Sequence, residues 1–150
     1  MGIVEDNAFE KPSLALLLSG LRAPPKLIAL YLAVYLPVGF FMNEFGKVVE
    51  IAEFANWWQV LTCYGLYMVP ASLLIRHRHW FDQYLFGLLA LGLLELGGYT
   101  LGTSIAHPDN ILDSIFTERN FSLSMVLWFG VYLPAGNLGV GWLARKLGIL

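Results

Sequence analysis

The segment that most constrains the fold is residues 81–105, FDQYLFGLLALGLLELGGYTLGTSI, an apolar run with one carboxylate, Glu95, near its middle. At ~1.5 Å of rise per residue, a helix of this length measures roughly 37 Å, enough to cross a hydrocarbon core of about 30 Å with some tilt. A carboxyl group at that depth costs at least ~2.5 kcal/mol on insertion scales, so it must be protonated, paired or beside a wet cavity. We therefore expect Glu95 to face protein rather than lipid.

Two glycines share the helix face of this acid. Gly98 and Gly102 follow Glu95 at helical spacing, and small residues four apart let two membrane helices approach closely. The sequence predicts that the Gly98/Gly102 face packs tightly on another helix. The same face is a candidate contact for a homo-oligomer or for a larger membrane complex.

Composition narrows the class of protein. The chain of 150 residues is 57% hydrophobic and 13% charged, which is more apolar material than a soluble domain of this size can bury. We expect one all-α, polytopic membrane domain over residues 1–150. The net charge of −2, with its cations scattered along the chain, excludes nucleic acid as a partner and indicates the lipid bilayer instead.

Hydropathy predicts a bundle of four transmembrane helices, over residues 26–44, 57–75, 81–105 and 121–144. Residues 12–22 are too short to span and are expected to form a helix in the membrane interface. Residues 45–56 carry acids on one side and apolar side chains elsewhere, which predicts a second short interfacial helix, in the first outer loop.

The cations orient this bundle. Seven of the nine Lys and Arg residues fall on one side of the predicted membrane, and Lys47 and Arg119 fall on the other. Because Lys and Arg accumulate in cytoplasmic loops, both termini should be cytoplasmic. That result requires an even number of spans, in agreement with the four that hydropathy predicts. The seven are Lys11, Arg22, Lys26, Arg76, Arg78, Arg145 and Lys146.

Tyrosines lie level with Glu95 in the other three spans. A phenol both donates and accepts a hydrogen bond, so it can contact either protonation state of a buried carboxyl. We predict a catalytic group of Glu95, Tyr35, Tyr64 and Tyr132. Further side chains that could contact a substrate are Tyr67, Tyr99, Trp58, Trp128, Asn137 and Glu44.

Metal and cofactor sites are not expected. The single cysteine, Cys63, excludes a cysteine-based metal knuckle. His77 and His79 diverge on a helix and lack a third ligand, so they are better explained by a basic patch that faces anionic headgroups. No predicted span contains a histidine that could ligate haem, and no glycine-rich phosphate loop is present.

Three functions fit this pattern. The first is a membrane-embedded enzyme or binding protein for a hydrophobic, lipid-like small molecule of the isoprenoid or sterol kind, with Glu95 as general acid and base in a cofactor-independent isomerisation or cyclisation. The second is a non-catalytic accessory subunit of a larger membrane complex, in which Glu95 makes a structural hydrogen bond. The third is a proton-coupled exporter of small molecules, which at four spans would have to dimerise.

Overall fold

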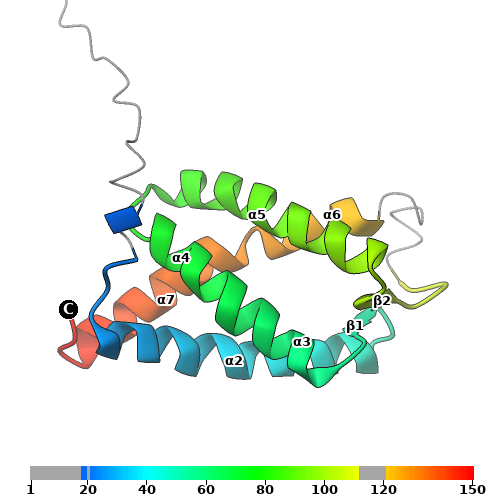
Figure 1. Cartoon of the computed structure of the whole chain (residues 1–150), viewed down its shortest axis with the longest axis horizontal. Helices are drawn as coiled ribbons and strands as arrows, with labels where there is room; N and C mark the ends of the chain where they lie inside the picture. Colours follow the sequence, from blue (N-terminus) through cyan, green and yellow to red (C-terminus); the bar gives the residue numbers. More distant parts are fainter. Residues whose placement is uncertain (1–17, 20, 112–120) are drawn as a thin grey trace, which may run out of the picture.

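The computed structural model describes residues 18–19, 21–111 and 121–150, and these are mostly helical (Figure 1). A small two-stranded sheet lies at one end of the bundle, and the C-terminus lies at the other (Figure 1). The elements in chain order are α2 (Pro25–Val48), β1 (Ala52–Phe54), α3 (Trp57–Leu61), η1 (Thr62–Met68), α4 (Val69–Ile75), α5 (Trp80–Thr100), β2 (Ser104–Ala106), α6 (Phe121–Phe129) and α7 (Tyr132–Lys146).

Three helical stretches of the described chain are long and apolar enough to cross a membrane: Pro25–Val48, Trp57–Ile75 and Met125–Lys146. They agree with the expected membrane class and with three of the predicted spans. The helix α5, with 21 residues, is not among them, so the count of four spans stays a prediction. The interfacial helix predicted over residues 12–22 lies largely outside the described residues.

The first long helix begins at a proline and carries one narrow buried face. Pro25 occupies the first turn of α2, where its fixed φ suits a helix and its missing N–H needs no partner. The helix continues through Pro37 and ends at Val48, beyond the predicted limit of residue 44. The buried residues of this face recur at every fourth position: Leu27, Tyr31, Tyr35 and Gly39.

The second long helix has the predicted bounds but an unusual middle. Its central seven residues, Thr62–Met68, form a π-helix between α3 and α4. Pro70 is the second residue after it, and it has no N–H to donate to the carbonyl group four residues earlier. Local π-helical adjustment is one way in which a membrane helix accommodates such a proline. The widened turn places Cys63, Tyr64 and Met68 in the protein interior.

The predicted span over residues 121–144 is broken into α6 and α7 at Gly130–Val131. The ring of Pro134 clashes with the carbonyl group of Gly130 in a regular helix, which explains the position of the break. The backbone of Gly130 also lies against α5: a Cβ atom added to Gly87 would be 2.7 Å from the Gly130 carbonyl oxygen. Gly87 and Gly130 therefore mark the close approach of α5 and α6.

The predicted interfacial helix in the first outer loop is wrong, because residues 52–54 form strand β1. This strand pairs antiparallel with β2, with Glu53 opposite Ile105. The Phe54 N–H donates to Asn43 Oδ1 at 2.8 Å, which fastens the sheet to the end of α2. The fold is thus helical with a small sheet rather than purely all-α, and the helix α5 ends at Thr100 instead of residue 105.

The Gly98/Gly102 helix face is also a wrong prediction. Gly102 lies beyond the end of α5 with φ +67, and a Cβ atom on it would touch nothing within 4 Å. The Thr103 N–H donates to the Gly98 carbonyl at 2.8 Å, a bond that closes the helix end and leaves Gly102 as the left-handed residue of the turn. Gly98 faces Ser104 of β2 rather than another helix.

Candidate functional site

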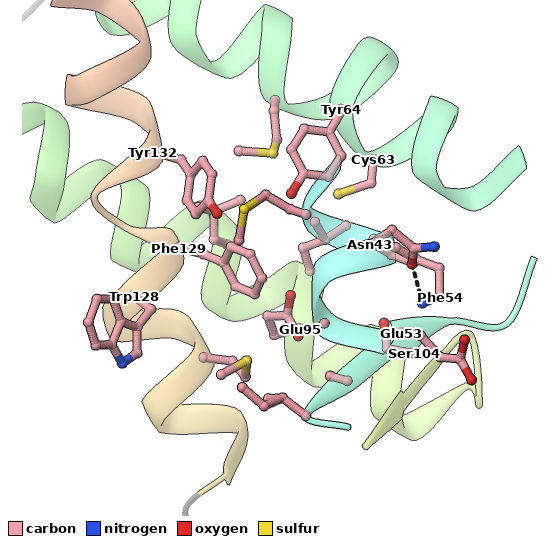
Figure 2. A pocket seen from close by; sticks show the side chains of 18 of the residues that line it. Asn43, Glu53, Phe54, Cys63, Tyr64, Glu95, Ser104, Trp128, Phe129 and Tyr132 are labelled. Carbon is pink, nitrogen blue, oxygen red and sulfur yellow. Dashed lines mark hydrogen bonds between the residues drawn. The ribbon is translucent and has the colours of Figure 1, made fainter. Parts of the chain in front are cut away.

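A cavity of about 350 Å³ lies between the helices and the sheet (Figure 2). Its volume falls within the range of small-molecule sites, roughly 300–1,000 Å³. The helices α5, α6 and α7, the segment η1, the end of α2 and both strands contribute to it. Most of its wall is apolar or aromatic, from Met42, Phe45, Met68, Leu91, Leu94, Met125, Trp128 and Phe129.

Glu95 reaches this cavity from α5. The residue is only 8% exposed, so the expectation that it faces protein is confirmed. Within residues 21–111 and 125–150, no hydrogen bond or ion pair to its carboxyl is formed, although Cys63 and Tyr64 lie within electrostatic range. A buried polar group without a partner is costly. Figure 2 shows this carboxyl in the middle of the lining side chains.

Two of the predicted tyrosines accompany Glu95. Tyr64 of η1 and Tyr132 of α7 both line the cavity (Figure 2). The ring of Tyr64 lies against Gly39, where an added Cβ atom would come within 2.5 Å of it. In the described part of the chain, neither hydroxyl group forms a protein hydrogen bond. Both hydroxyls therefore keep the capacity to donate to a bound molecule or to accept from one.

Tyr35 and Asn137 lie elsewhere, in a buried polar network between α2, α4, α5 and α7. The Tyr35 hydroxyl is 2.6 Å from Ser72 Oγ. Tyr31 donates to Asn137 Oδ1 at 2.6 Å. Asn137 Nδ2 in turn donates to Gln83 Oε1 at 2.7 Å and to the Ser72 carbonyl at 3.1 Å. These bonds satisfy the polar groups within the bundle, so the network joins helices rather than offering groups to a substrate.

A second cavity, of about 530 Å³, lies on the other side of Glu95. Trp58 and Tyr67 line it, and the Tyr67 hydroxyl donates to the Ala90 carbonyl at 2.6 Å. Its rim carries outward-facing leucines, Leu66 and Leu101, which are 76% and 78% exposed. Both cavities share five lining residues: Phe54, Cys63, Leu94, Glu95 and Ser104.

Of the remaining predicted substrate contacts, one lines the first cavity and one lines neither cavity. Trp128 lines the first cavity. Glu44 is exposed and lines neither cavity, whereas its neighbour Asn43 does. The side chain of Tyr99 lies outside the described part of the structure.

Sequence reasoning missed the contribution of the sheet to the cavity. Glu53 and Ser104 line it from β1 and β2, and Glu53 Oε1 is 3.8 Å from His107 Nε2. No local signal marked the strand, because Ala52, Glu53 and Phe54 include no β-branched residue and the nearby Val48 belongs to α2.

The end of the bundle opposite the sheet is basic but holds no ligand cluster. In the described residues, no group of three His, Cys, Asp or Glu side chains could hold a metal ion. Arg76 Nε donates to His77 Nε2 at 2.8 Å, so the imidazole acts as an acceptor. Partial burial and the nearby Arg76 charge lower the pKa of His77, which favours this neutral form.

Fold and site together define a class: a small helical protein with helices of membrane-spanning length around an aromatic cavity, which holds one buried acid without a partner among the described residues. No protein-family model matches the chain, and neither does any curated protein or any solved structure. The function must therefore be argued from the geometry of the site.

Proposed function

We propose that the protein is a membrane-embedded, cofactor-independent isomerase or cyclase that takes a hydrophobic, lipid-like molecule of the isoprenoid or sterol kind from the bilayer. The observation that carries this proposal is the buried Glu95 carboxyl, which has no partner in the described chain and borders an apolar cavity of about 350 Å³. An ionisable side chain kept at such a cost inside a bundle indicates a functional site.

The second cavity supports entry from the lipid phase. It opens beside exposed leucines of η1 and α5, a surface that suits an acyl or isoprenoid chain. Phe54 and Leu94 stand between the two cavities. A ligand that enters sideways past them reaches Glu95 without leaving an apolar environment.

Proton transfer by one carboxyl is sufficient for this chemistry. Glu95 donates a proton to one carbon of a double bond, and a cation forms on the adjacent carbon. Loss of a proton from a neighbouring carbon to the same carboxylate gives an isomer and restores the acid, so no cofactor is consumed. The faces of Phe129 and Tyr132 can stabilise the transient cation, and the apolar wall keeps water from trapping it.

The proposal includes four spans with cytoplasmic termini. Among the described residues, six cations belong to segments at the end of the bundle opposite the sheet, and Lys47 belongs to the end of α2 beside the sheet (Figure 1). The six are Arg22, Lys26, Arg76, Arg78, Arg145 and Lys146. This asymmetry matches the rule that cytoplasmic segments are basic.

Cysteine labelling in intact cells tests this topology. A cysteine at Asp109, in the exposed turn after β2, should react with an impermeant thiol reagent from outside, and a cysteine at Leu150 should react only after the cells are opened. The parent chain is the control, since its single thiol, Cys63, is buried. Labelling at Asp109 from the cytoplasmic side alone would show that the orientation is inverted.

A cavity-filling variant tests the ligand site. Met125 lines the cavity from α6, so Met125→Trp should occupy the space that the ligand needs. We expect a hydrophobic molecule to co-purify with the parent protein, to be identified by mass spectrometry of an organic extract, and to fall at least fivefold in this variant. Leu127→Trp, at an exposed position of the same helix that lines neither cavity, should keep it.

Other outcomes favour the alternatives. An accessory subunit would purify without any bound small molecule, and the two tryptophan variants would then behave alike. A proton-coupled exporter would move its substrate across vesicles in response to a pH gradient and release it chemically unchanged.

A further inference from the structure

We infer that this cavity is built to hold positive charge on a hydrophobic skeleton, so that it binds hydrophobic ammonium ions as mimics of a cationic reaction intermediate. The inference rests on the proposed function and adds to it a class of ligand, hydrophobic ammonium ions, which the site should bind more tightly than uncharged molecules of the same shape. Three features of the cavity carry it: the charged groups in its wall, its aromatic faces and the absence of a built anion site.

The charged groups of the lining are all acidic. Glu95 and Glu53 border the cavity, and within the described residues no Lys, Arg or His lines it. The imidazole of His107 lies near the other acid, with Nε2 3.8 Å from Glu53 Oε1. Among the described residues, Glu95 is therefore the carboxyl of the cavity that has no positive group beside it. The other titratable groups that face the cavity are Cys63, Tyr64 and Tyr132. A positively charged centre is the ligand group that complements this set.

Aromatic faces reinforce the same preference. Phe129 of α6 and Tyr132 of α7 reach the cavity beside the break between these helices, and Tyr64 reaches it from η1 (Figure 2). The face of an aromatic ring attracts a cation, most strongly for tryptophan and more strongly when water is excluded. Rings from two directions together with one unpaired acid resemble the cages that recognise quaternary ammonium groups.

An anionic intermediate fits the site poorly. An enolate or a similar oxyanion needs positive groups or converging N–H donors aimed at it. The Asn43 side chain is already engaged, because Oδ1 accepts from the Phe54 N–H and Nδ2 donates to Glu44 Oε1 at 3.4 Å. Tyr64 and Tyr132 hydroxyls could support an anion only next to the Glu95 carboxyl, which repels it. The geometry therefore favours chemistry through a cation.

The test compares two probes of equal shape. Decyltrimethylammonium carries a permanent charge, and its uncharged isostere has a quaternary carbon in place of the nitrogen. Binding is measured with purified full-length protein in phosphatidylcholine nanodiscs, from Trp128 and the other tryptophans by fluorescence, with concentrations referred to the lipid phase and empty nanodiscs as background. The parent protein should bind the ammonium probe at least about tenfold more tightly than the isostere.

Variants assign the preference to the site. Glu95→Gln keeps the side-chain size but loses the charge, so it should reduce the tenfold preference to about twofold or less. Phe129→Leu should reduce it severalfold, because a cation–π contact is lost. Asp82→Asn removes a carboxylate from the first turn of the same helix, where the side chain is exposed and outside both cavities, and should leave the preference unchanged.

The outcomes separate this inference from the proposed function. Equal affinity of the parent protein for the two probes overturns the charge preference, even if Glu95→Gln does not fold, and leaves the cavity as a site for neutral lipids. A preference that survives in Glu95→Gln also overturns it, because the charge selection then originates elsewhere. Failure of both probes to bind, together with no co-purified molecule, overturns the ligand site itself.

Discussion

Glu95→Gln should abolish conversion of the co-purified molecule while leaving the protein folded. Glutamine matches the size of the neutral acid and most of its hydrogen-bonding capacity, but it cannot exchange a proton. General acid–base catalysis contributes roughly 10²–10⁴-fold to a rate, so we expect a loss of that order. The reaction is followed in heavy water by mass spectrometry, since a proton delivered by Glu95 then enters the product as deuterium.

Two further variants complete that experiment. Glu95→Asp withdraws the carboxyl by one methylene and should lose much of the rate, because proton transfer requires hydrogen-bond distance. Asp82→Asn, at an exposed position on the same helix, should retain it. A Glu95→Gln protein that converts the molecule at the parental rate, in the same membrane at the same pH, would end both the enzyme proposal and the proton-coupled exporter alternative.

Asn137→Leu should cause a large loss of stability in detergent without a comparable change in the cavity. Asn137 joins α7 to Tyr31 of α2, Ser72 of α4 and Gln83 of α5. Its removal breaks three buried hydrogen bonds and leaves their partners unsatisfied. At about 0.6–1.7 kcal/mol for each such bond in a membrane protein, we expect the three bonds to contribute a loss of roughly 2–5 kcal/mol. Thermal or denaturant unfolding in detergent measures it.

Comparison variants show whether the network is the cause. Leu138→Ala shortens a side chain at the adjacent, exposed position of α7. It should lower the stability far less than Asn137→Leu. Tyr31→Phe removes one of the three hydrogen bonds, so it should lower the stability less than Asn137→Leu does. The protein with both substitutions should lose less stability than the sum of the two single losses. Strict additivity of the two effects would contradict a shared network.

The long helices and the burial of Glu95 could be predicted from the sequence because both depend on local composition. A run of apolar residues must shield its backbone as a helix in an apolar environment, and this places α2 and the helix Trp57–Ile75 within a few residues of their observed bounds. A single carboxyl in such a run is unfavourable in contact with lipid. The inward orientation of Glu95 follows from that energetic cost.

Half of the candidate site could be predicted in the same way. The sequence predicts Tyr64 and Tyr132 level with Glu95 along their helices and Trp128 as a further substrate contact, and all three line the cavity. The position of a residue along its helix gives its depth in the bundle, but it does not show which neighbouring helix the side chain faces. For this reason Tyr35, at the same depth, bonds to Ser72 instead.

Only the tertiary structure decided the remaining features, because each depends on groups distant in the chain. Strand β1 forms because β2, about fifty residues later, supplies its hydrogen bonds. The same pairing ends α5 early, turns Gly102 into a left-handed cap and brings Glu53 and Ser104 to the cavity. Asn137 likewise becomes a structural residue only where three other helices present polar groups to it. Local patterns determined which segments are helical, and long-range pairing determined what those helices enclose.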